Sequence, residues 1–390
     1  MRILIVVQRY GTEVIGGSEA HARIVATRLA LRHEVEVATT TALDYWTWAP
    51  HFAPGTTSID GLAVHRFPVE AGRDPRFKEL EDAVLLRDHG LAAELDWPRI
   101  QGPHVPALYD FLDASRRRYD AFLFYTYIYA PTVLGLPLVP ERALLIPTAH
   151  DELPLALAPY RALFHLPRGI GYLTPEERGL VHARFHNEDV PDLVLGIGLD
   201  PLLADDGAGD AAAFRARHDL TGPLVAYLGQ VTAGKGCDEL VADWIRYRDD
   251  GGTGTLLLAG TLALDLPARA DIRALGRISD AEKADLLAAA DVLVHPSHLE
   301  SLGIVLLEAW QAGTPVLVPG WNAVTAGQVG RSGGGRTYAT HEAFGRELGL
   351  LLDNGDGAAR GAAGRDWVGE ECAWGRFDER LETLVELVHG

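Results

Sequence analysis

Continuous apolar runs alternate with helix-like stretches along both halves of this chain, and no other feature limits the possible folds as strongly. Most runs lack the apolar–polar alternation of a strand with one wet face, which indicates parallel strands covered on both sides. The alternation predicts an α/β protein with two doubly wound Rossmann-like domains, and 390 residues are enough for two cores. The expected strands are 2–8, 34–40, 62–69, 120–127, 143–149, 223–229, 254–260, 291–297 and 314–320, and the expected helices include 18–32, 104–117, 237–247, 280–290 and 302–312.

The chain divides most simply near residues 194–213, where a polar, Gly/Ala-rich stretch follows an apolar one. We therefore expect an N-terminal domain at 1–195 and a C-terminal domain at 196–372. The last segment, 373–390, has the apolar spacing of a helix, and we expect it to pack back on the first domain.

The composition excludes several classes of function. A formal net charge of −19 argues against nucleic acid or an anionic membrane as the main partner, because both require a basic surface. The run Arg116–Arg118 is most simply a solvated helix end. Two cysteines form no disulfide framework and no metal-binding spacing, which fits a reducing compartment. No apolar run has the length of a membrane span. We expect a cytoplasmic protein with at most peripheral membrane contact.

Ligands of open α/β sheets bind beyond the carboxyl ends of the strands, so the residues there are the candidates for a site. Gly16 and Gly17 end a long loop before a helix, where they allow either a close ligand or a plain turn. Gly229 to Lys235 match the start of a phosphate-binding P-loop, but Gly236 replaces the Ser or Thr that would bind magnesium. The chain has only three lysines, so Lys235 is notable. His150 closes another strand, in either a structural or a functional role.

The stretch HPSHLESLGIVLLEAWQAGTPVLV, residues 295–318, is apolar yet carries two glutamates. A helix starting near residues 301–302 and ending at Gly313 places Glu300 just before its N-terminus and Glu308 inside it. A carboxylate there favours hydroxyl donors such as those of a ribose, and the free amides of the first turn favour a pyrophosphate. One nucleoside-diphosphate sugar satisfies both requirements. The alternative is an exposed Glu308 and a Glu300 favoured only by the helix dipole.

With these residues, the chain resembles the family-4 glycosyltransferases, which are retaining enzymes of two-domain GT-B fold. GGSEAHARIVATRLALRHEVEVAT resembles the family's first glycine loop and helix, YLGQVTAGKGCDELV its donor-phosphate loop, and residues 295–318 its E-x7-E signature. The segments RYGTEVIGGSEA, ALDYWTW, PTAHDE and RSGGG are similar to a bacterial branch linked to surface-polysaccharide assembly. The resemblance implies two Rossmann-like domains that face each other across a cleft.

The resemblance also implies roles for individual residues. Glu300 would bind hydroxyls of the donor sugar and Glu308 the ribose, while His150 would lie beside the anomeric carbon; His150 and Glu300 are the catalytic candidates. The remaining donor-site candidates are Gly16, Gly17, Gln230, Lys235, Arg277, Ile278, Leu302, Gly303 and Ile304, with Arg277 and Ile278 near the base and the last three offering amides to the diphosphate. Such enzymes react by front-face attack, in which the departing diphosphate helps to take the acceptor proton, usually without a metal or other cofactor.

The chain departs from the family pattern at two places. Gln230 stands where the family usually has Arg, and a glutamine donates hydrogen bonds without bringing charge. The turn usually written PNGVD is GIGLD here, residues 196–200. The first departure affects how strongly a diphosphate is bound, and with it the donor's identity.

The acceptor is the part that the sequence defines least. Aromatic residues at predicted strand ends or loops of the first half are suited to sugar rings, although each is also a simple core residue. Tyr10, Tyr125 and Tyr127 are the acceptor-site candidates, and Tyr45, Trp46, Trp48 and Tyr129 occupy comparable positions.

We therefore predict a metal-independent, retaining hexosyltransferase. It would transfer from a nucleotide sugar to a glycan, a lipid-linked glycan or a small molecule. The alternatives are a P-loop nucleotide hydrolase, a non-catalytic nucleotide-sugar-binding protein of the same fold, and a sugar-nucleotide epimerase.

Overall fold

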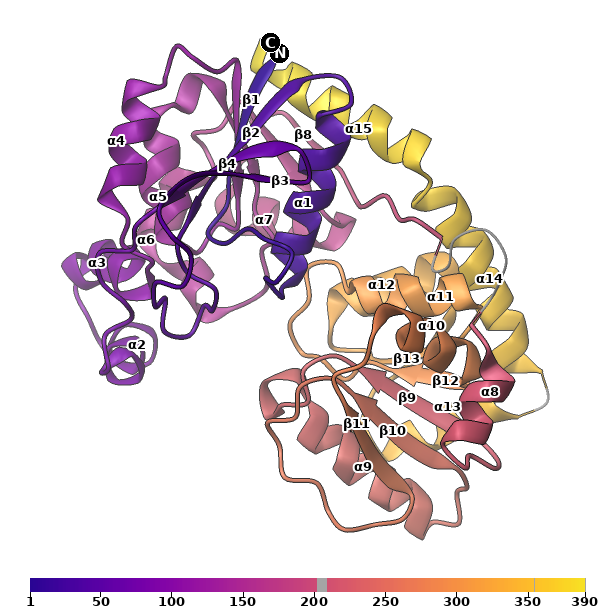
Figure 1. Cartoon of the computed structure of the whole chain (residues 1–390). Helices are drawn as coiled ribbons and strands as arrows, with labels where there is room; N and C mark the ends of the chain where they lie inside the picture. The colour runs from indigo at the N-terminus through magenta and orange to yellow at the C-terminus, as the bar shows by residue number, and fades with distance from the viewer. Residues whose placement is uncertain (202–208, 354, 390) are drawn as a thin grey trace. The chain divides into compact units, whose positions relative to one another are not determined.

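The computed structural model describes residues 1–201, 209–353 and 355–389, which form two compact units (Figure 1). Unit 1 contains Met1–Gly198 and Gly375–Gly390, and unit 2 contains Leu199–Trp374. The expected boundaries, at 195/196 and 372/373, lie a few residues earlier in each case. Part of the expected connection 194–213, residues 202–208, lies outside the described residues.

Unit 1 is built on an eight-stranded sheet in the order β3-β4-β2-β1-β5-β6-β7-β8. Every neighbouring pair is parallel except β3–β4. The strands are β1 Arg2–Val6, β2 Glu34–Thr40, β3 Gly55–Ile59, β4 Leu62–Phe67, β5 Ala121–Tyr125, β6 Ala143–Ile146, β7 Gly169–Tyr172 and β8 Asp192–Val194. The helices are α1 Gly17–Leu29, α2 Phe77–Leu85, α3 Leu91–Gln101, α4 Pro106–Ala114, α5 Ala130–Gly135, α6 Ala158–Leu163, α7 Pro175–Phe185 and α15 Trp374–Glu386, with short 3₁₀ turns at Leu136–Leu138, Pro140–Arg142, Leu153–Ala156 and Leu387–His389.

The expected strands of unit 1 all form, and β1, β5 and β6 at its centre are apolar and almost fully buried. β7 and β8 are not among the expected strands. β5, for example, has five fully buried residues. The sequence did not indicate β3, since its residues GTTSI are polar and largely exposed. β3 forms because Asp60 and Gly61, both at positive φ, turn the chain back onto β4.

The C-terminal helix α15 packs on α1 within unit 1, so the end of the chain lies beside its beginning (Figure 1). Arg28 of α1 donates to Asp378 with Nε–Oδ1 at 2.9 Å, and His33 Nε2 lies 3.0 Å from Glu382 Oε2. Phe377 packs edge-on against His21, with ring centroids 6.1 Å apart.

Unit 2 holds a fully parallel six-stranded sheet in the order β11-β10-β9-β12-β13-β14. The strands are β9 Leu224–Leu228, β10 Thr255–Ala259, β11 Ile272–Gly276, β12 Val292–Val294, β13 Val316–Pro319 and β14 Gly335–Tyr338. The helices are α8 Ala211–Arg217, α9 Cys237–Asp249, α10 Asp280–Ala289, α11 Ile304–Ala312, α12 Ala323–Ser332, α13 His341–Leu352 and α14 Asp356–Glu371, with a 3₁₀ turn, η4, at Ala233–Lys235. The strand order reverses between β9 and β12, which is where such sheets bind ligands.

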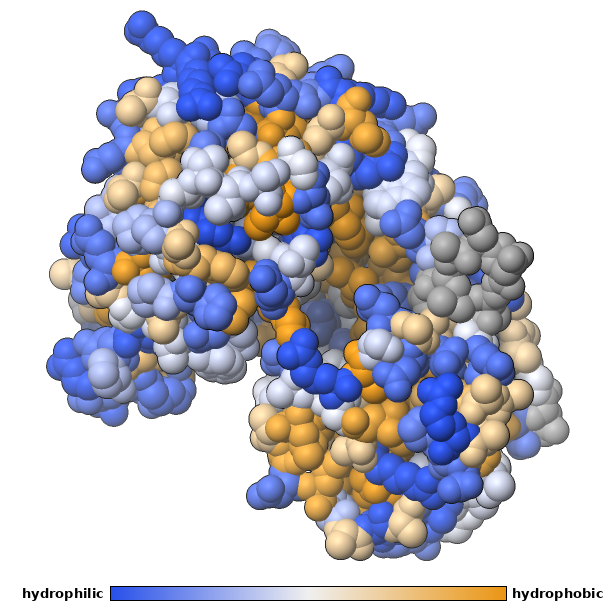
Figure 2. All heavy atoms as spheres, in the orientation of Figure 1, coloured by the Kyte–Doolittle hydropathy of each residue, from blue (hydrophilic) through white to orange (hydrophobic). Residues whose placement is uncertain are grey.

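Hydrophilic residues cover much of the face shown in Figure 2, with apolar residues in smaller patches between them. This distribution fits the excess of acidic residues. Among the described residues, no helix combines the length and the apolar character that crossing a bilayer requires.

Candidate functional site

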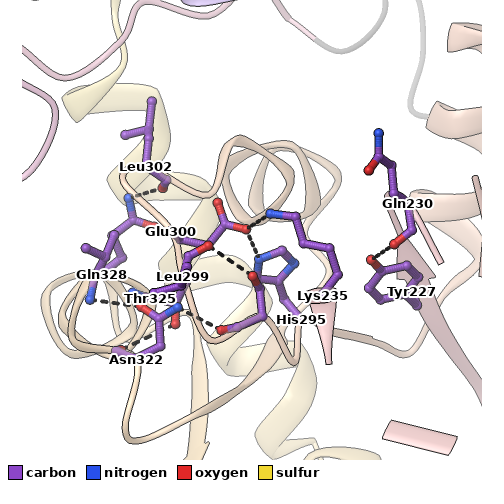
Figure 3. Close-up of polar contacts among 12 residues, drawn as sticks. Tyr227, Gln230, Lys235, His295, Leu299, Glu300, Leu302, Asn322, Thr325 and Gln328 are labelled. Carbon is purple, nitrogen blue, oxygen red and sulfur yellow. Dashed lines mark hydrogen bonds and ion pairs between the residues drawn. The ribbon is translucent and has the colours of Figure 1, made fainter. Parts of the chain in front are cut away.

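Two loops of unit 2 meet around Glu300 at the carboxyl edge of the sheet. Glu300 lies between β12 and α11, and its side chain is 15% exposed. Lys235 ends η4, which follows the adjacent strand β9, and its Nζ lies 2.7 Å from Glu300 Oε1. His295 Nε2 lies 3.1 Å from the same oxygen. The Lys235 ammonium and the His295 imidazole therefore converge on one carboxylate oxygen (Figure 3).

The surroundings of Glu300 keep it ionised. Burial alone would raise the pKa of Glu300, but the hydrogen bond from His295 and the charge of Lys235 outweigh it and hold the pKa well below its usual range. Because the Glu300 carboxylate can only accept a hydrogen bond from Nε2, it favours the His295 tautomer that has its proton on Nε2. Nδ1 of His295 is buried and has no hydrogen-bond partner among the described residues. An ionised carboxylate only accepts hydrogen bonds, so Glu300 is suited to binding hydroxyl groups.

Helix α11 starts at Ile304, two to three residues later than predicted, so Ser301, Leu302 and Gly303 separate Glu300 from its first turn. Gly303 caps the helix in the left-handed conformation, with φ 66°. The amide of Leu306 donates to the Gly303 carbonyl at 2.9 Å, which leaves the amides of Ile304 and Val305 at the helix end. Helix α12 fixes the preceding loop, because Gln328 Nε2 donates to the carbonyl of Leu302 at 2.7 Å and Asn322 Nδ2 to that of Ser297 at 2.8 Å (Figure 3). The amide-rich helix end is therefore held rigidly and is suited to an anion.

Glu308 lies one turn further along α11 and pairs with a lysine that the sequence analysis did not assign. Lys283 of α10 places its Nζ 2.6 Å from Glu308 Oε1 and 3.2 Å from Asp280 Oδ1. Burial lowers the pKa of Lys283, but the charge of Glu308 outweighs it and raises the pKa above the usual range. The scarcity of lysine, which drew attention to Lys235, was the signal that could have identified Lys283 as well.

The other donor-site candidates of unit 2 lie at the same edge of the sheet but contact neither glutamate through their side chains. Gln230 is exposed, its carbonyl accepts from Tyr227 Oη at 2.7 Å, and its side chain extends away from Lys235 (Figure 3). Arg277 is exposed and Ile278 half-buried in the turn after β11. Their predicted roles toward a donor stay predictions.

In unit 1, the glycine loop is fastened by a buried ion pair that sequence reasoning missed. Arg9 and Glu19 are 5% and 3% exposed, with Nη2 and Oε1 2.6 Å apart. A Cβ on Gly16 would lie 2.1 Å from Glu19 Oε2, so a larger residue here would displace the carboxylate of the ion pair, whereas a Cβ on Gly17 would meet nothing within 4 Å. Arg9 also donates to the carbonyls of Leu43 and Ile15, which ties two strand-end loops together.

His150 follows β6 at the carboxyl edge of the same sheet and is partly exposed. Its Nδ1 lies 3.4 Å from Glu152 Oε1, which accepts a hydrogen bond from Tyr127 Oη at 2.8 Å. A tyrosine and a glutamate therefore support the imidazole from one side.

The predicted acceptor contacts of Tyr10, Tyr125 and Tyr127 are corrected by the structure. All three rings are fully buried, because β1 and β5 are central strands whose ends remain covered by α1 and neighbouring loops, so none offers a face to a sugar. Trp48 is buried too. Trp46, in contrast, is 64% exposed. It packs on Tyr45 with ring centroids 4.6 Å apart, and Arg9 lies 5.2 Å from the Tyr45 ring.

Among the described residues, no group of three or more His, Cys, Asp or Glu side chains is arranged to hold a metal ion.

Residues 210–357 match the family described as glycosyl transferases group 1. The glycogen synthase of Mycobacterium tuberculosis (strain CDC 1551 / Oshkosh) is 32% identical over 204 residues, which cover 48% of this chain and 49% of that protein. The GDP-mannose-dependent alpha-(1-6)-phosphatidylinositol monomannoside mannosyltransferase of the same strain is 29% identical over 220 residues, covering 49% and 54%. The chain thus spans about half the length of the curated relatives it matches.

Among solved structures, sucrose-phosphate synthase from Thermosynechococcus elongatus superposes with a TM-score of 0.71 at 18% identity, covering 100% of this chain and 99% of that one. Identity this low shows the fold alone. The predicted α/β fold with two doubly wound domains of the GT-B type is confirmed.

Proposed function

The chain carries a glycosyl transferases group 1 domain over residues 210–357, and on that premise we propose that the protein is a glycosyltransferase. It transfers a hexose-type sugar from a nucleoside-diphosphate sugar to a glycan, a lipid-linked glycan or a small-molecule acceptor. The mannosyltransferase relative is named as GDP-mannose-dependent, which supports a nucleotide sugar as the donor class. The cytoplasm remains the predicted location.

The observation that carries this proposal is the ionised Glu300 in the loop that leads into α11, with Lys235 beside it. The diphosphate accepts hydrogen bonds from the first-turn amides and from Lys235. The ribose hydroxyls donate to Glu308, and the sugar hydroxyls donate to Glu300. Each group then obtains the partner that its charge requires.

We propose that transfer retains the configuration at the anomeric carbon and needs no metal or other cofactor. The acceptor hydroxyl attacks from the face that the diphosphate leaves, and a diphosphate oxygen takes its proton. Lys235 and the helix amides offset the charge that develops on the leaving group.

A screen of nucleoside-diphosphate sugars by thermal shift tests the donor class. A ligand present at 100 times its Kd adds about 2.7 kcal/mol to the free energy of unfolding. Transfer or slow donor hydrolysis should then be detected in EDTA, and NMR of the product should show the donor's anomeric configuration. Transfer that disappears in EDTA and returns with magnesium or manganese would contradict the metal-free mechanism.

Three alternatives correspond to other outcomes of such experiments. Binding without transfer or hydrolysis would identify a non-catalytic nucleotide-sugar-binding protein. Magnesium-dependent turnover of ATP or GTP would identify a nucleotide hydrolase that uses Gly229 to Lys235. Interconversion of one nucleotide sugar into another would identify an epimerase.

A further inference from the structure

One buried carboxylate in unit 1 joins the carboxyl ends of two neighbouring strands. Glu177 lies in the first turn of α7 and is 1% exposed. Its Oε1 accepts the amide of Ala149, after β6, and its Oε2 accepts the amide of Leu173, after β7, both at 2.6 Å. Thr174 and Glu177 have the spacing of a capping box, which needs a bond only to the cap of the helix itself. The bond to Ala149 goes beyond helix capping, because it reaches a different strand.

The segment that Glu177 holds is conformationally strained. Thr148 and Thr126 have φ of 49° and 64°, in the left-handed region that β-branched residues rarely adopt. They end the adjacent strands β6 and β5, and their hydroxyl oxygens lie 3.3 Å apart. Strain of this kind persists only where the surroundings enforce it, and it gathers at functional sites. Ala149, the residue after Thr148, is the one whose amide Glu177 accepts.

Keeping a carboxylate at this place is unfavourable by itself. Burial raises the pKa of Glu177 to about 7, although the amides of Leu173 and Ala149 and the nearby His150 act to lower it. A glutamine or an apolar residue would avoid that cost but could not accept both amides.

The residue after Ala149 is His150, whose imidazole is oriented from another direction. Glu152 Oε1 lies 3.4 Å from His150 Nδ1, and Tyr127, which directly follows the strained Thr126, donates to the same oxygen. The backbone of His150 is therefore fixed by Glu177, and its ring by the Tyr127–Glu152 pair.

We propose that Glu177 is a positioning residue for His150: it holds the strained strand end so that the imidazole keeps one direction at the carboxyl edge of the sheet. This inference rests on the proposed function, in which His150 lies beside the anomeric carbon. Glu177 acts through the backbone and contacts no substrate.

The test compares Glu177→Gln with Glu36→Gln, the same change at another buried glutamate of unit 1. Glu36 is 8% exposed and accepts from Tyr119, Arg118 and His65 in the first half of β2, away from the carboxyl edge. We expect Glu177→Gln to lower kcat about 10- to 100-fold with the donor KM and the affinity for free nucleoside diphosphate unchanged, since unit 2 binds the nucleotide. Glu36→Gln should leave kcat unchanged, whatever it does to Tm.

A second readout does not depend on activity. The imidazole NMR signals of His150, assigned with His150→Asn, should shift in Glu177→Gln and stay in place in Glu36→Gln. If Glu177→Gln does not fold, Glu177→Asp replaces it; its shorter carboxylate reaches one amide and should give a smaller effect of the same kind. Unchanged kcat together with unchanged His150 signals would overturn the inference. Normal transfer by His150→Asn would instead contradict the proposed role of His150, and the NMR signals would still decide whether Glu177 positions it.

Discussion

Lys235 Nζ and Glu300 Oε1 lie 2.7 Å apart, although 65 residues separate them in the chain. Each group is suited to a different part of a nucleotide sugar, the ammonium to the diphosphate and the carboxylate to sugar hydroxyls. The two groups neutralise each other, so the largely buried Glu300 carboxylate has a charged partner. In the proposed function, donor binding exchanges this contact for two others, so the pair is a suitable place to test the proposal by mutation.

We expect Glu300→Gln to lower kcat about 100- to 1,000-fold, the range for removing one group that stabilises charge in a transition state. Affinity for free nucleoside diphosphate should stay the same or increase, because Lys235 loses its competing partner. Glu347→Gln is the matched control, since Glu347 lies in the same unit, is 13% exposed and pairs with Arg336 at 3.1 Å. Steady-state kinetics and calorimetric titration separate the two effects. A kcat like that of Glu347→Gln would remove Glu300 from the catalytic group.

We expect Glu308→Gln to weaken nucleoside-diphosphate binding about 10- to 100-fold, because a hydrogen bond to a charged group contributes about 1.5–3 kcal/mol. A 2′,3′-dideoxynucleotide provides the control. It should bind the native protein less tightly than the ribonucleotide, and the two should bind Glu308→Gln alike. If removal of the hydroxyls costs the same affinity in both proteins, Glu308 does not bind the ribose and its pairing with Lys283 is structural.

The sequence predicted the fold and the helix that carries Glu308, because both depend on local patterns; the roles of the site residues stay predictions. Apolar runs define the central strands, and the eight-residue spacing of the two glutamates defines a helix end and its second turn. The partners of these residues come from distant elements, as Lys283 does for Glu308, and no local pattern specifies such a pair. The prediction for Tyr10 was wrong because its ring is buried. An aromatic residue at a strand end has the same sequence signature whether its ring is covered or exposed.

The exposed aromatic surface beside the glycine loop replaces the buried tyrosines as the candidate for binding acceptor. We expect Trp46→Ala to raise the acceptor KM severalfold to about tenfold, given about 0.5–1.5 kcal/mol for an aromatic contact. Trp46→Phe retains a ring and should lose less. Donor KM should not change in either variant. Initial-rate kinetics at saturating donor measure this, and an acceptor KM that is the same in all three proteins would exclude Trp46 from the acceptor site.

His21 should make stability depend on pH. Burial lowers its pKa to about 4, although its contact with the Gly196 carbonyl, at 2.8 Å, acts to raise it. The unfolded chain, with a pKa near 6.5, then binds more protons than the folded one between these values. The neutral His21 therefore contributes roughly 3 kcal/mol to the free energy of unfolding above pH 6.5. This contribution is lost as the pH falls toward 4. Urea unfolding at several pH values gives the free energy of unfolding as a function of pH. Over that range it should change less steeply with pH in His21→Gln than in the native protein. An equal dependence on pH in the two proteins would contradict the prediction.

The last prediction concerns Gln230, the residue that stands where the family resemblance implies an Arg. Its side chain is exposed in the loop between β9 and Lys235, so a longer cation can be accommodated there without disturbing the core. Gln230→Arg should tighten binding of free nucleoside diphosphate by severalfold to about a hundredfold, because a guanidinium adds a positive charge and can bind a phosphate through two parallel hydrogen bonds. Gln230→Ala should weaken binding, and kcat should fall in the Arg variant if release of the diphosphate becomes slow. Calorimetric titration of the native protein and the two variants with one nucleotide measures the order of their affinities. Equal affinities would mean that this loop does not contact the phosphates, and the proposed role of Lys235 toward the diphosphate would then be wrong as well.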